Sequence, residues 1–149
     1  NQMRITLLKS AIHPDCHQDI GEHTFTYALY PHAEGWRQAK TVQEAMKLNQ
    51  PALSAEGGCA GDETSFVWID KQNVIIETVK EAEDGDGVII RLYESENART
   101  KAHISFEKPV ASVESCDCVE KTKETVCVAG DGFDITIKPY EIQTYRVRF

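Results

Sequence analysis

The chain has 149 residues, of which 41% are hydrophobic and 27% charged, a composition typical of one folded domain. Sixteen Lys and Arg residues against 24 Asp and Glu residues give a net charge of −8, which repels phosphate backbones and argues against a nucleic-acid partner. No run approaches the roughly 18 apolar residues of a membrane span, and no secretory leader is recognised.

Two segments in the first thirty residues have the pattern of β-strands. Residues 3–8 form a strand-like apolar run, and large apolar residues alternate with small or polar ones over 24–29. Alternation with a period of two is typical of a strand with one buried face. The run at 3–8 also suggests that the chain is a piece of something longer.

One segment predicts a helix, over residues 36–49. Apolar residues recur there at helical spacing, and Thr41 with Glu44 fits a capping box, so the helix is expected to start or restart at Thr41. Pro51 follows its end. Residues 50–64 are rich in Gly and unpatterned, which predicts a long loop, and such loops are often functional.

The rest of the chain is again dominated by the strand pattern. It covers residues 73–80, 87–94, 102–107, 125–129, 133–138 and 145–149, separated by turn sequences at 83–87 (EDGDG), 96–98 and 130–132. For the whole chain we expect about nine or ten strands with short turns. The predicted fold is all-β, a mainly antiparallel β-sandwich with one short helical excursion, forming a single domain over 1–149; an open barrel is the alternative.

A cluster of metal-ligand residue types lies between His13 and His23. It contains His13, Asp15, Cys16, His17, Asp19, Glu22 and His23. A metal site would need three or four of these side chains to converge. Because Asp and Pro also favour turns, a polar loop is the preferred interpretation and a metal site the alternative.

Two features of the sequence could form a sugar site. Glycoside hydrolysis needs two flanking carboxyl groups, but 24 acids, among them Glu77 and Glu94, leave no pair selected by the sequence. Aromatic residues could form a sugar platform, although core positions are their commoner place. They are Tyr27, Tyr30, Trp36, Trp68, Tyr93 and Tyr140.

The five cysteines are Cys16, Cys59, Cys116, Cys118 and Cys127. Their number is odd, and no pair has the spacing of a zinc knuckle, so reduced side chains in a cytosolic protein are expected. Cys116 and Cys118 would lie on one face of a strand, and a metal or redox pair is the alternative there.

Several phrases occur together in an order that resembles a known family. The most specific are residues 25–32 (FTYALYPH), 77–80 (ETVK), 82–85 (AEDG) and 91–94 (RLYE), with supporting matches at 4–8, 13–15, 19–23, 48–51 and 138–142. Together they resemble the C-terminal region of glycoside hydrolase family 38, the α-mannosidases, with the bacterial and cytosolic branch most similar. Residues 116–120 depart from the family pattern, since two cysteines stand in that stretch.

The resemblance implies a retaining α-mannosidase acting on an α-mannoside substrate. Family members are longer and carry an N-terminal catalytic domain with an Asp nucleophile, an acid carboxyl and a divalent metal, usually zinc, bound by two His and two Asp. None of those motifs matches a position here, so no catalytic residue, metal ligand or cofactor is assigned to this chain. It is expected to be inactive alone and to pack in cis against the catalytic domain.

The same resemblance leaves the contacts with that domain open. Loops 10–23 and 50–64 are the longest candidates, and Asp15, Asp19, Asp84 and Asp86 are candidates to face the cleft. A cytoplasmic location and a possible homo-oligomer are further expectations. The alternative function is an autonomous carbohydrate-binding or oligomerisation module.

Overall fold

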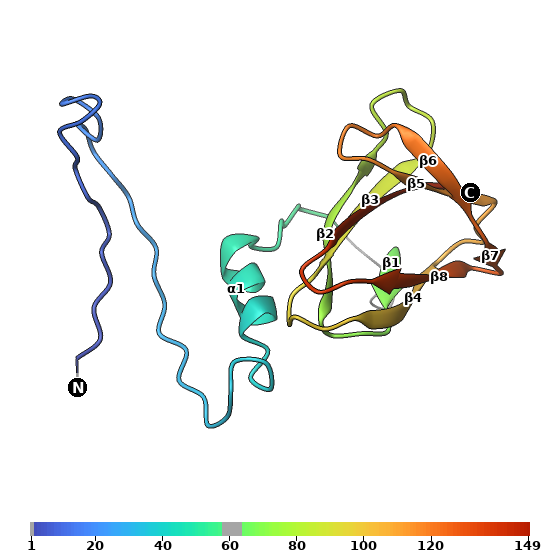
Figure 1. The fold of residues 1–149 in the computed structure, drawn as a ribbon, viewed down its shortest axis with the longest axis horizontal. Helices are drawn as coiled ribbons and strands as arrows, with labels where there is room; N and C mark the ends of the chain where they lie inside the picture. Colours follow the sequence, from blue (N-terminus) through green and yellow to red (C-terminus); the bar gives the residue numbers. More distant parts are fainter. Residues whose placement is uncertain (1, 58–63) are drawn as a thin grey trace. The chain divides into compact units, whose positions relative to one another are not determined.

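Nine strands and one helix make up the regular structure of the described residues, 2–57 and 64–149 of a computed structural model (Figure 1). They are α1 (Thr41–Asn49), β1 (Val67–Ile69), β2 (Val74–Glu81), β3 (Val88–Glu94), β4 (Thr100–Phe106), β5 (Ser112–Cys116), β6 (Thr122–Val126), β7 (Val128–Ala129), β8 (Gly132–Ile137) and β9 (Ile142–Arg148). The chain divides into two units, Asn1–Thr41 and Val42–Phe149, and each is described by itself.

The second unit contains all nine strands, in two sheets. One sheet has the order β1-β4-β8-β7 and the other β2-β3-β9-β5-β6, and every neighbouring pair is antiparallel. Figure 1 shows the two sheets as facing layers. The prediction of a mainly antiparallel β-sandwich with one short helix is confirmed.

The core lies between the two sheets and follows the alternation of the strands. Phe133 is fully buried, and its ring lies 6.3 Å from that of Phe106 and 5.1 Å from that of Tyr145. The strands contribute their inward residues because alternate side chains point to opposite faces. The buried apolar cluster comprises Val74, Ile90, Leu92, Ala102, Ile104, Phe106, Val110, Val113, Phe133, Ile135, Ile137, Tyr145 and Val147.

The predicted turns join strands as expected, except where the chain changes sheets. Residues 82–87 close the β2–β3 hairpin, and Gly130 and Asp131 separate β7 from β8. Residues 96–98 lead instead from β3 in one sheet to β4 in the other. Local turn chemistry predicts that the chain reverses but not which sheet it enters.

The helix begins at Thr41, one of the two starts predicted, and ends at Asn49. The capping box does not form, because Thr41 is already helical and its buried hydroxyl has no hydrogen-bond partner among the described residues. None of the described helices is long and apolar enough to cross a membrane. Part of the predicted loop 50–64, including Cys59, falls outside the described residues.

The predicted strands at 3–8 and 24–29 are not present. The structure assigns no strand to residues 2–40, and the side chains of Met3, Ile5, Tyr27 and Leu29 are 88%, 70%, 69% and 78% exposed. The alternating pattern is real, but a strand requires a hydrogen-bonded neighbour as well as a pattern. That neighbour is absent from the described part of the chain.

Candidate functional site

The β2–β3 hairpin carries two of the predicted site residues, and arginines on β9 bind both of them. Nη1 of Arg146 donates to both carboxylate oxygens of Asp84, at 2.8 and 2.7 Å. Arg148 holds Asp86 in the same way, with Nε donating to both oxygens at 3.0 Å. β9 pairs with β3, so the hairpin turn folds over the end of β9.

The network extends from these pairs to the β5–β6 turn. Nη1 of Arg148 donates to Glu114 at 3.0 Å. The carboxylate of Glu120 accepts the backbone N–H of Glu83 at 2.9 Å and lies 2.8 Å from the ammonium of Lys80. These contacts join β2, β5 and β9 through charged groups, so we call Lys80, Asp84, Asp86, Glu114, Glu120, Arg146 and Arg148 the hairpin network.

Hydrogen bonds in the hairpin network lower the pKa values of three of its acids, Asp84, Asp86 and Glu120. Hydrogen bonding from Arg146 lowers the pKa of Asp84, and hydrogen bonding from Arg148 lowers that of Asp86. The backbone N–H of Glu83, then Lys80, lowers the pKa of Glu120. A general acid needs a raised pKa, so these groups are suited to holding the hairpin in place. That Asp84 and Asp86 also face a substrate cleft stays a prediction.

Asp15 and Asp19, the other two predicted site residues, lie in the turn between the extended segments of the first unit. The carboxylate of Asp15 accepts the backbone N–H of His17 at 2.8 Å, which forms a local turn. Asp19 adopts a left-handed backbone, with φ 65°, and its carbonyl oxygen lies 2.9 Å from Nε2 of His23. Both aspartates are exposed. Their proposed approach to a cleft stays a prediction.

The metal-ligand types between His13 and His23 converge only in part. Within residues 2–57 and 64–149, the one group of three that could share an ion is Asp15, Cys16 and His17, whose ligand atoms lie within 4.8 Å of one another. All three are exposed and consecutive, and His23 instead stacks on Phe25. The turn in which the His17 N–H donates to Asp15 explains why these three side chains lie close together.

Glu94 is an acid whose importance the sequence did not reveal. Its side chain is 1% exposed, and its carboxylate accepts Nδ2 of Asn73 at 2.8 Å and the backbone N–H groups of Glu96 and Tyr140 at 2.8 and 3.1 Å. Burial raises its pKa, but the hydrogen bonds outweigh burial and leave the pKa lowered. One carboxylate thus joins the start of β2, the end of β3 and the β8–β9 turn.

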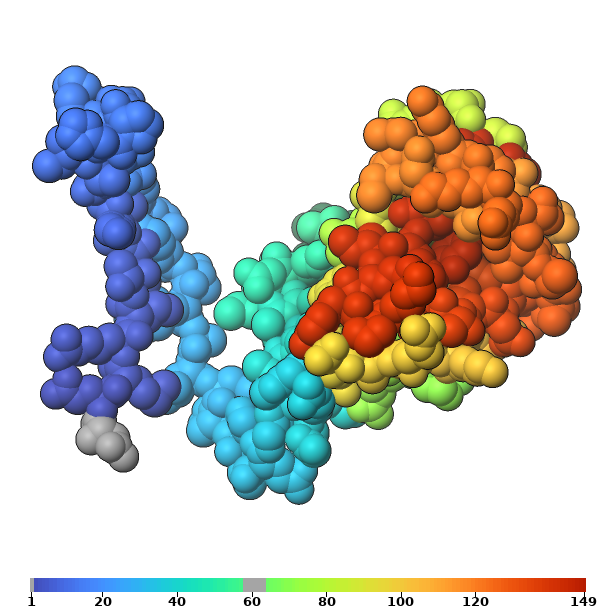
Figure 2. Space-filling view, viewed as in Figure 1, coloured from blue at the N-terminus to red at the C-terminus, as the bar shows by residue number. Residues whose placement is uncertain are grey.

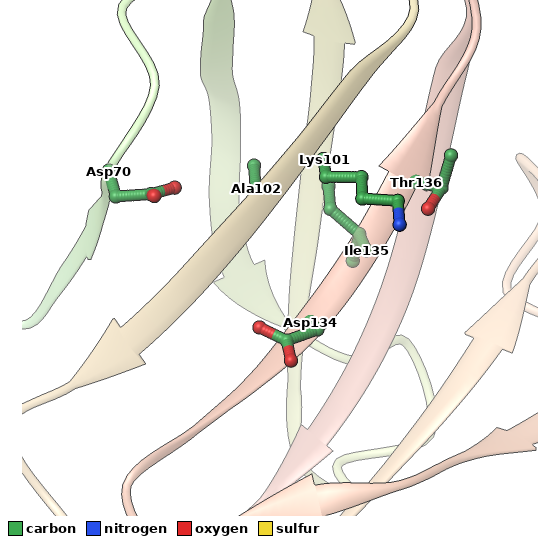
Figure 3. A pocket seen from close by; sticks show the side chains of 6 residues that line it. All are labelled: Asp70, Lys101, Ala102, Asp134, Ile135 and Thr136. Carbon is green, nitrogen blue, oxygen red and sulfur yellow. The ribbon is translucent and has the colours of Figure 1, made fainter.

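A polar hollow of about 440 Å³ lies on the sheet β1-β4-β8-β7 (Figure 3). Asp70, Lys101, Asp134 and Thr136 line it, together with Ala102 and Ile135. The backbone N–H of His103 donates to Asp70 at 2.7 Å, and Nδ1 of His103 lies 2.7 Å from Asp134. The pKa of Asp70 is lowered, mainly by the hydrogen bond from Lys71 and next by that from the backbone N–H of His103.

The aromatic residues proposed as a platform are mostly at the surface, not in the core as expected. Tyr27, Tyr30, Trp36, Trp68 and Tyr140 are exposed, and Tyr93 is half-buried. Trp68 pairs in register with Ser105 on β4, which places it on the same outward face as Lys101 and His103. This face therefore combines an exposed indole with charged groups.

The described cysteines, Cys16, Cys116, Cys118 and Cys127, are free. Cys116 is buried at the end of β5, whereas Cys118 is exposed in the following turn. The expectation that they share one strand face is wrong, because Asp117 accepts the N–H groups of Val119 and Lys121 and turns the chain between them.

Comparison with known proteins identifies the sandwich. Residues 73–145 match the model of the family described as the glycosyl hydrolases family 38 C-terminal beta sandwich domain. Over these residues the chain is similar to that C-terminal sandwich domain. The resemblance to the C-terminal region of this family is thereby confirmed, whereas the branch stays a prediction. The match begins just before β2 and ends within β9.

Longer relatives extend the similarity to the first unit of this chain. It is 29% identical over 150 residues to α-mannosidase G of Dictyostelium discoideum, a match that covers 95% of this chain and 14% of the relative. It is 28% identical to α-mannosidase 2C1 of Mus musculus, covering 97% and 14%, and 28% identical to that of Homo sapiens, covering 94% and 14%. The chain therefore spans about one seventh of the length of these relatives.

Proposed function

We propose that this chain is a non-catalytic C-terminal part of an α-mannosidase and that it packs in cis against a catalytic domain and supports it. The observation that carries the proposal is the family 38 sandwich match over residues 73–145, together with relatives that are named α-mannosidases. The substrate of the whole protein would be an α-mannoside, cleaved with retention of configuration.

The chemistry of the described acids supports a structural role. Retaining hydrolysis needs one carboxylate as nucleophile and one carboxyl group with a raised pKa as acid. In the hairpin network, arginine hydrogen bonds lower the pKa values of Asp84 and Asp86 instead, and the backbone N–H of Glu83, followed by Lys80, lowers that of Glu120. These side chains stabilise a surface that a second domain can contact.

A divalent metal, which we propose to be zinc, would act in the catalytic domain of the whole protein. The described residues do not fit the set of two His and two Asp, since Asp15, Cys16 and His17 are consecutive, exposed and partly bonded to one another. No step of the reaction is therefore assigned to this chain.

The test compares the 149-residue chain with the full-length protein that contains it, using an aryl α-mannoside. We expect turnover only by the full-length protein, with loss of turnover after chelation and recovery with zinc. Turnover by the 149-residue chain alone would refute the non-catalytic role. A full-length protein without α-mannosidase activity would refute the proposed parent function.

A second candidate function is carbohydrate binding by the polar hollow. Exposed aromatic rings next to carboxylates and an ammonium group suit a sugar, whose C–H faces stack on a ring while its hydroxyls form hydrogen bonds. Trp68 and the hollow around Asp134 and Lys101 share one sheet face. Titration calorimetry with mannose and mannobiose tests this: heat that Asp134→Ala abolishes supports it, and flat traces at millimolar sugar end it.

Location and assembly are also proposals. A cytoplasmic location is supported by four free cysteines, three of them exposed, since exposed thiols persist in reducing compartments. Imaging of a fluorescent fusion checks the location, and a secreted pool would contradict it. Self-association is checked by sedimentation velocity over a range of concentrations, and a single monomeric species throughout would contradict it.

A further inference from the structure

The first unit exposes an unusual amount of apolar surface on two extended segments, 3–8 and 24–30. The side chains of Met3, Ile5, Tyr27 and Leu29 are at least 69% exposed, and Phe25 is 43% exposed. Such side chains are normally covered, and contiguous exposed apolar surface marks an interaction site. We call this pair of segments the arm.

Most exposed apolar residues of the arm gather on one side. In an extended chain, alternate side chains point to opposite faces, and the five residues above all have odd numbers. Leu8 and Tyr30, at the ends of the two segments, have even numbers and are 42% and 47% exposed. A hollow of about 340 Å³ is lined by Met3 and Ile5 from one segment and Tyr27 and Leu29 from the other, with Arg4 and Ala28. Figure 2 shows the two segments, in dark and lighter blue, running beside each other. The arm thus has one continuous apolar face.

The backbone of the arm is also unpaired. Within residues 2–57, no backbone hydrogen bond involves 3–8 or 24–30, although the turn between them contains bonds such as Ile20 N–H to His17 carbonyl at 3.2 Å. Backbone donors and acceptors that become buried must find partners. Extended segments with free backbone groups and one apolar face are suited to joining the edge of another sheet.

Charge separates the first unit, which contains the arm, from the sandwich, and the arm itself has one charged residue, Arg4. Residues 2–40 contain four Lys or Arg and four Asp or Glu, so their net charge is zero. Residues 42–149 contain the remaining 12 basic and 20 acidic residues and therefore carry the whole net charge of −8. A neutral segment can be buried against protein at a lower electrostatic cost than a strongly acidic one.

The comparisons indicate which protein surface covers the arm. The family sandwich model begins at residue 73, so the arm lies outside it. The similarity to α-mannosidase G nevertheless covers 95% of the chain, which leaves too few unmatched residues to omit both segments of the arm, while it covers only 14% of that relative. The arm therefore belongs to the shared α-mannosidase sequence, and most of that sequence lies outside this chain.

We propose that the arm contributes two strands to a β-sheet in another part of the full-length protein. Residues 3–8 and 24–30 pair with an edge of that sheet through their backbone groups, and the face formed by Met3, Ile5, Tyr27 and Leu29 packs into its core. The inference rests on the proposed function, because the α-mannosidase relatives identify the occupant as protein in cis. It adds the surface through which this chain is joined to the rest of the molecule.

Amide hydrogen exchange tests the proposal, measured on the 149-residue chain and on the full-length protein. We expect the amides of 3–8 and 24–30 to exchange at near-unprotected rates in the 149-residue chain and on the order of 100-fold more slowly in the full-length protein. Rapid exchange in both proteins would overturn the proposal. Protection in the 149-residue chain that increases with its concentration would also overturn it, because the occupant would then be a second copy.

Two variants of the full-length protein locate the contact. Tyr27→Lys places a charge on the apolar face and is expected to reduce the protection of the arm at least tenfold, whereas Thr26→Lys adds the same charge on the opposite face and is expected to retain it. Equal protection in both variants would contradict the assigned face. If Tyr27→Lys does not fold, the comparison of amide exchange between the wild-type 149-residue chain and the wild-type full-length protein still tests the proposal.

The activity of the full-length protein separates the two proposals. Hydrolysis of an aryl α-mannoside with an unprotected arm would refute the docking surface and leave the proposed function intact. A protected arm in a protein without α-mannosidase activity would refute the proposed function and leave the docking surface intact.

Discussion

Arg146 and Asp84 form the central ion pair of the hairpin network, although 62 residues separate them along the chain. Nη1 of Arg146 lies 2.8 and 2.7 Å from the two oxygens of Asp84, and the side chains are 7% and 57% exposed. The arginine is thus taken out of water and the aspartate is not. This asymmetry decides what happens when one partner is removed.

We predict that Asp84→Asn destabilises the chain more than Arg146→Met. Removing Asp84 leaves a buried guanidinium without its bidentate partner, whereas removing Arg146 leaves an exposed carboxylate that water can solvate. Urea unfolding at pH 7 measures both, with Glu107→Gln as a control that removes one exposed charge outside the network. The opposite order of the two variants would show that the pair is not governed by the burial of the arginine.

The stability of the chain should depend on pH through the hairpin network. The folded-state pKa values of Asp84, Asp86 and Glu120 are lowered, so the unfolded chain binds more protons and stability rises with pH. The contribution is complete above the unfolded values of about 3.9 and 4.3 and is lost as the pH falls through the lower folded values.

Urea midpoints measured between pH 7 and pH 3 check this expectation. The fall in midpoint below about pH 4 should be smaller in Asp84→Asn than in the wild type, because one titrating group is removed. Glu107→Gln should retain the wild-type fall. An equal fall in all three proteins would place the acid sensitivity outside the network.

Glu94 is predicted to be the acid whose loss costs most. Leucine at this position would leave the N–H groups of Glu96 and Tyr140 and Nδ2 of Asn73 without their acceptor in a buried site. Each buried unpaired donor costs about 1–3 kcal/mol, so we expect Glu94→Leu to lower the free energy of unfolding by about 3 kcal/mol or more. Glu94→Gln keeps one acceptor oxygen and should lose less. Equal unfolding free energies for the two variants would contradict this role.

The sandwich could be predicted because the patterns that encode its strands and turns lie within short stretches of sequence. On β4 and β8 the alternation that buries Ile104 and Phe133 is visible in the sequence, and the sequence of residues 83–87 encodes the β2–β3 hairpin. The strand order was not visible, since the pairing of β9 with both β3 and β5 depends on contacts between distant residues.

The roles of polar residues were less predictable than the core. Glu94 has the same side chain as many surface acids, and only the meeting of three distant segments buries it. The sequence places Asp84 and Asp86 in a predicted turn, and the structure adds the arginines of β9 that bind them. The alternation at residues 3–8 and 24–29 predicts strands that the structure does not form, because the described residues offer these segments no hydrogen-bonded neighbour.

Two glycines of the β2–β3 turn distinguish the cost of a strained backbone from the cost of a steric contact. Gly85 has φ 74° with ample space for a Cβ, whereas Gly87 has φ 95° and a Cβ there would lie 2.7 Å from the carbonyl oxygen of Val147 on β9. We expect Gly85→Ala to cost about 1–2 kcal/mol, the penalty of a left-handed backbone. Gly87→Ala should cost clearly more and weaken the pairing of β3 with β9. Thermal unfolding ranks the two variants, and amide exchange of Val88 and Val147 reports on the pairing. If Gly87→Ala is no less stable than Gly85→Ala, the close approach of β9 does not constrain this turn.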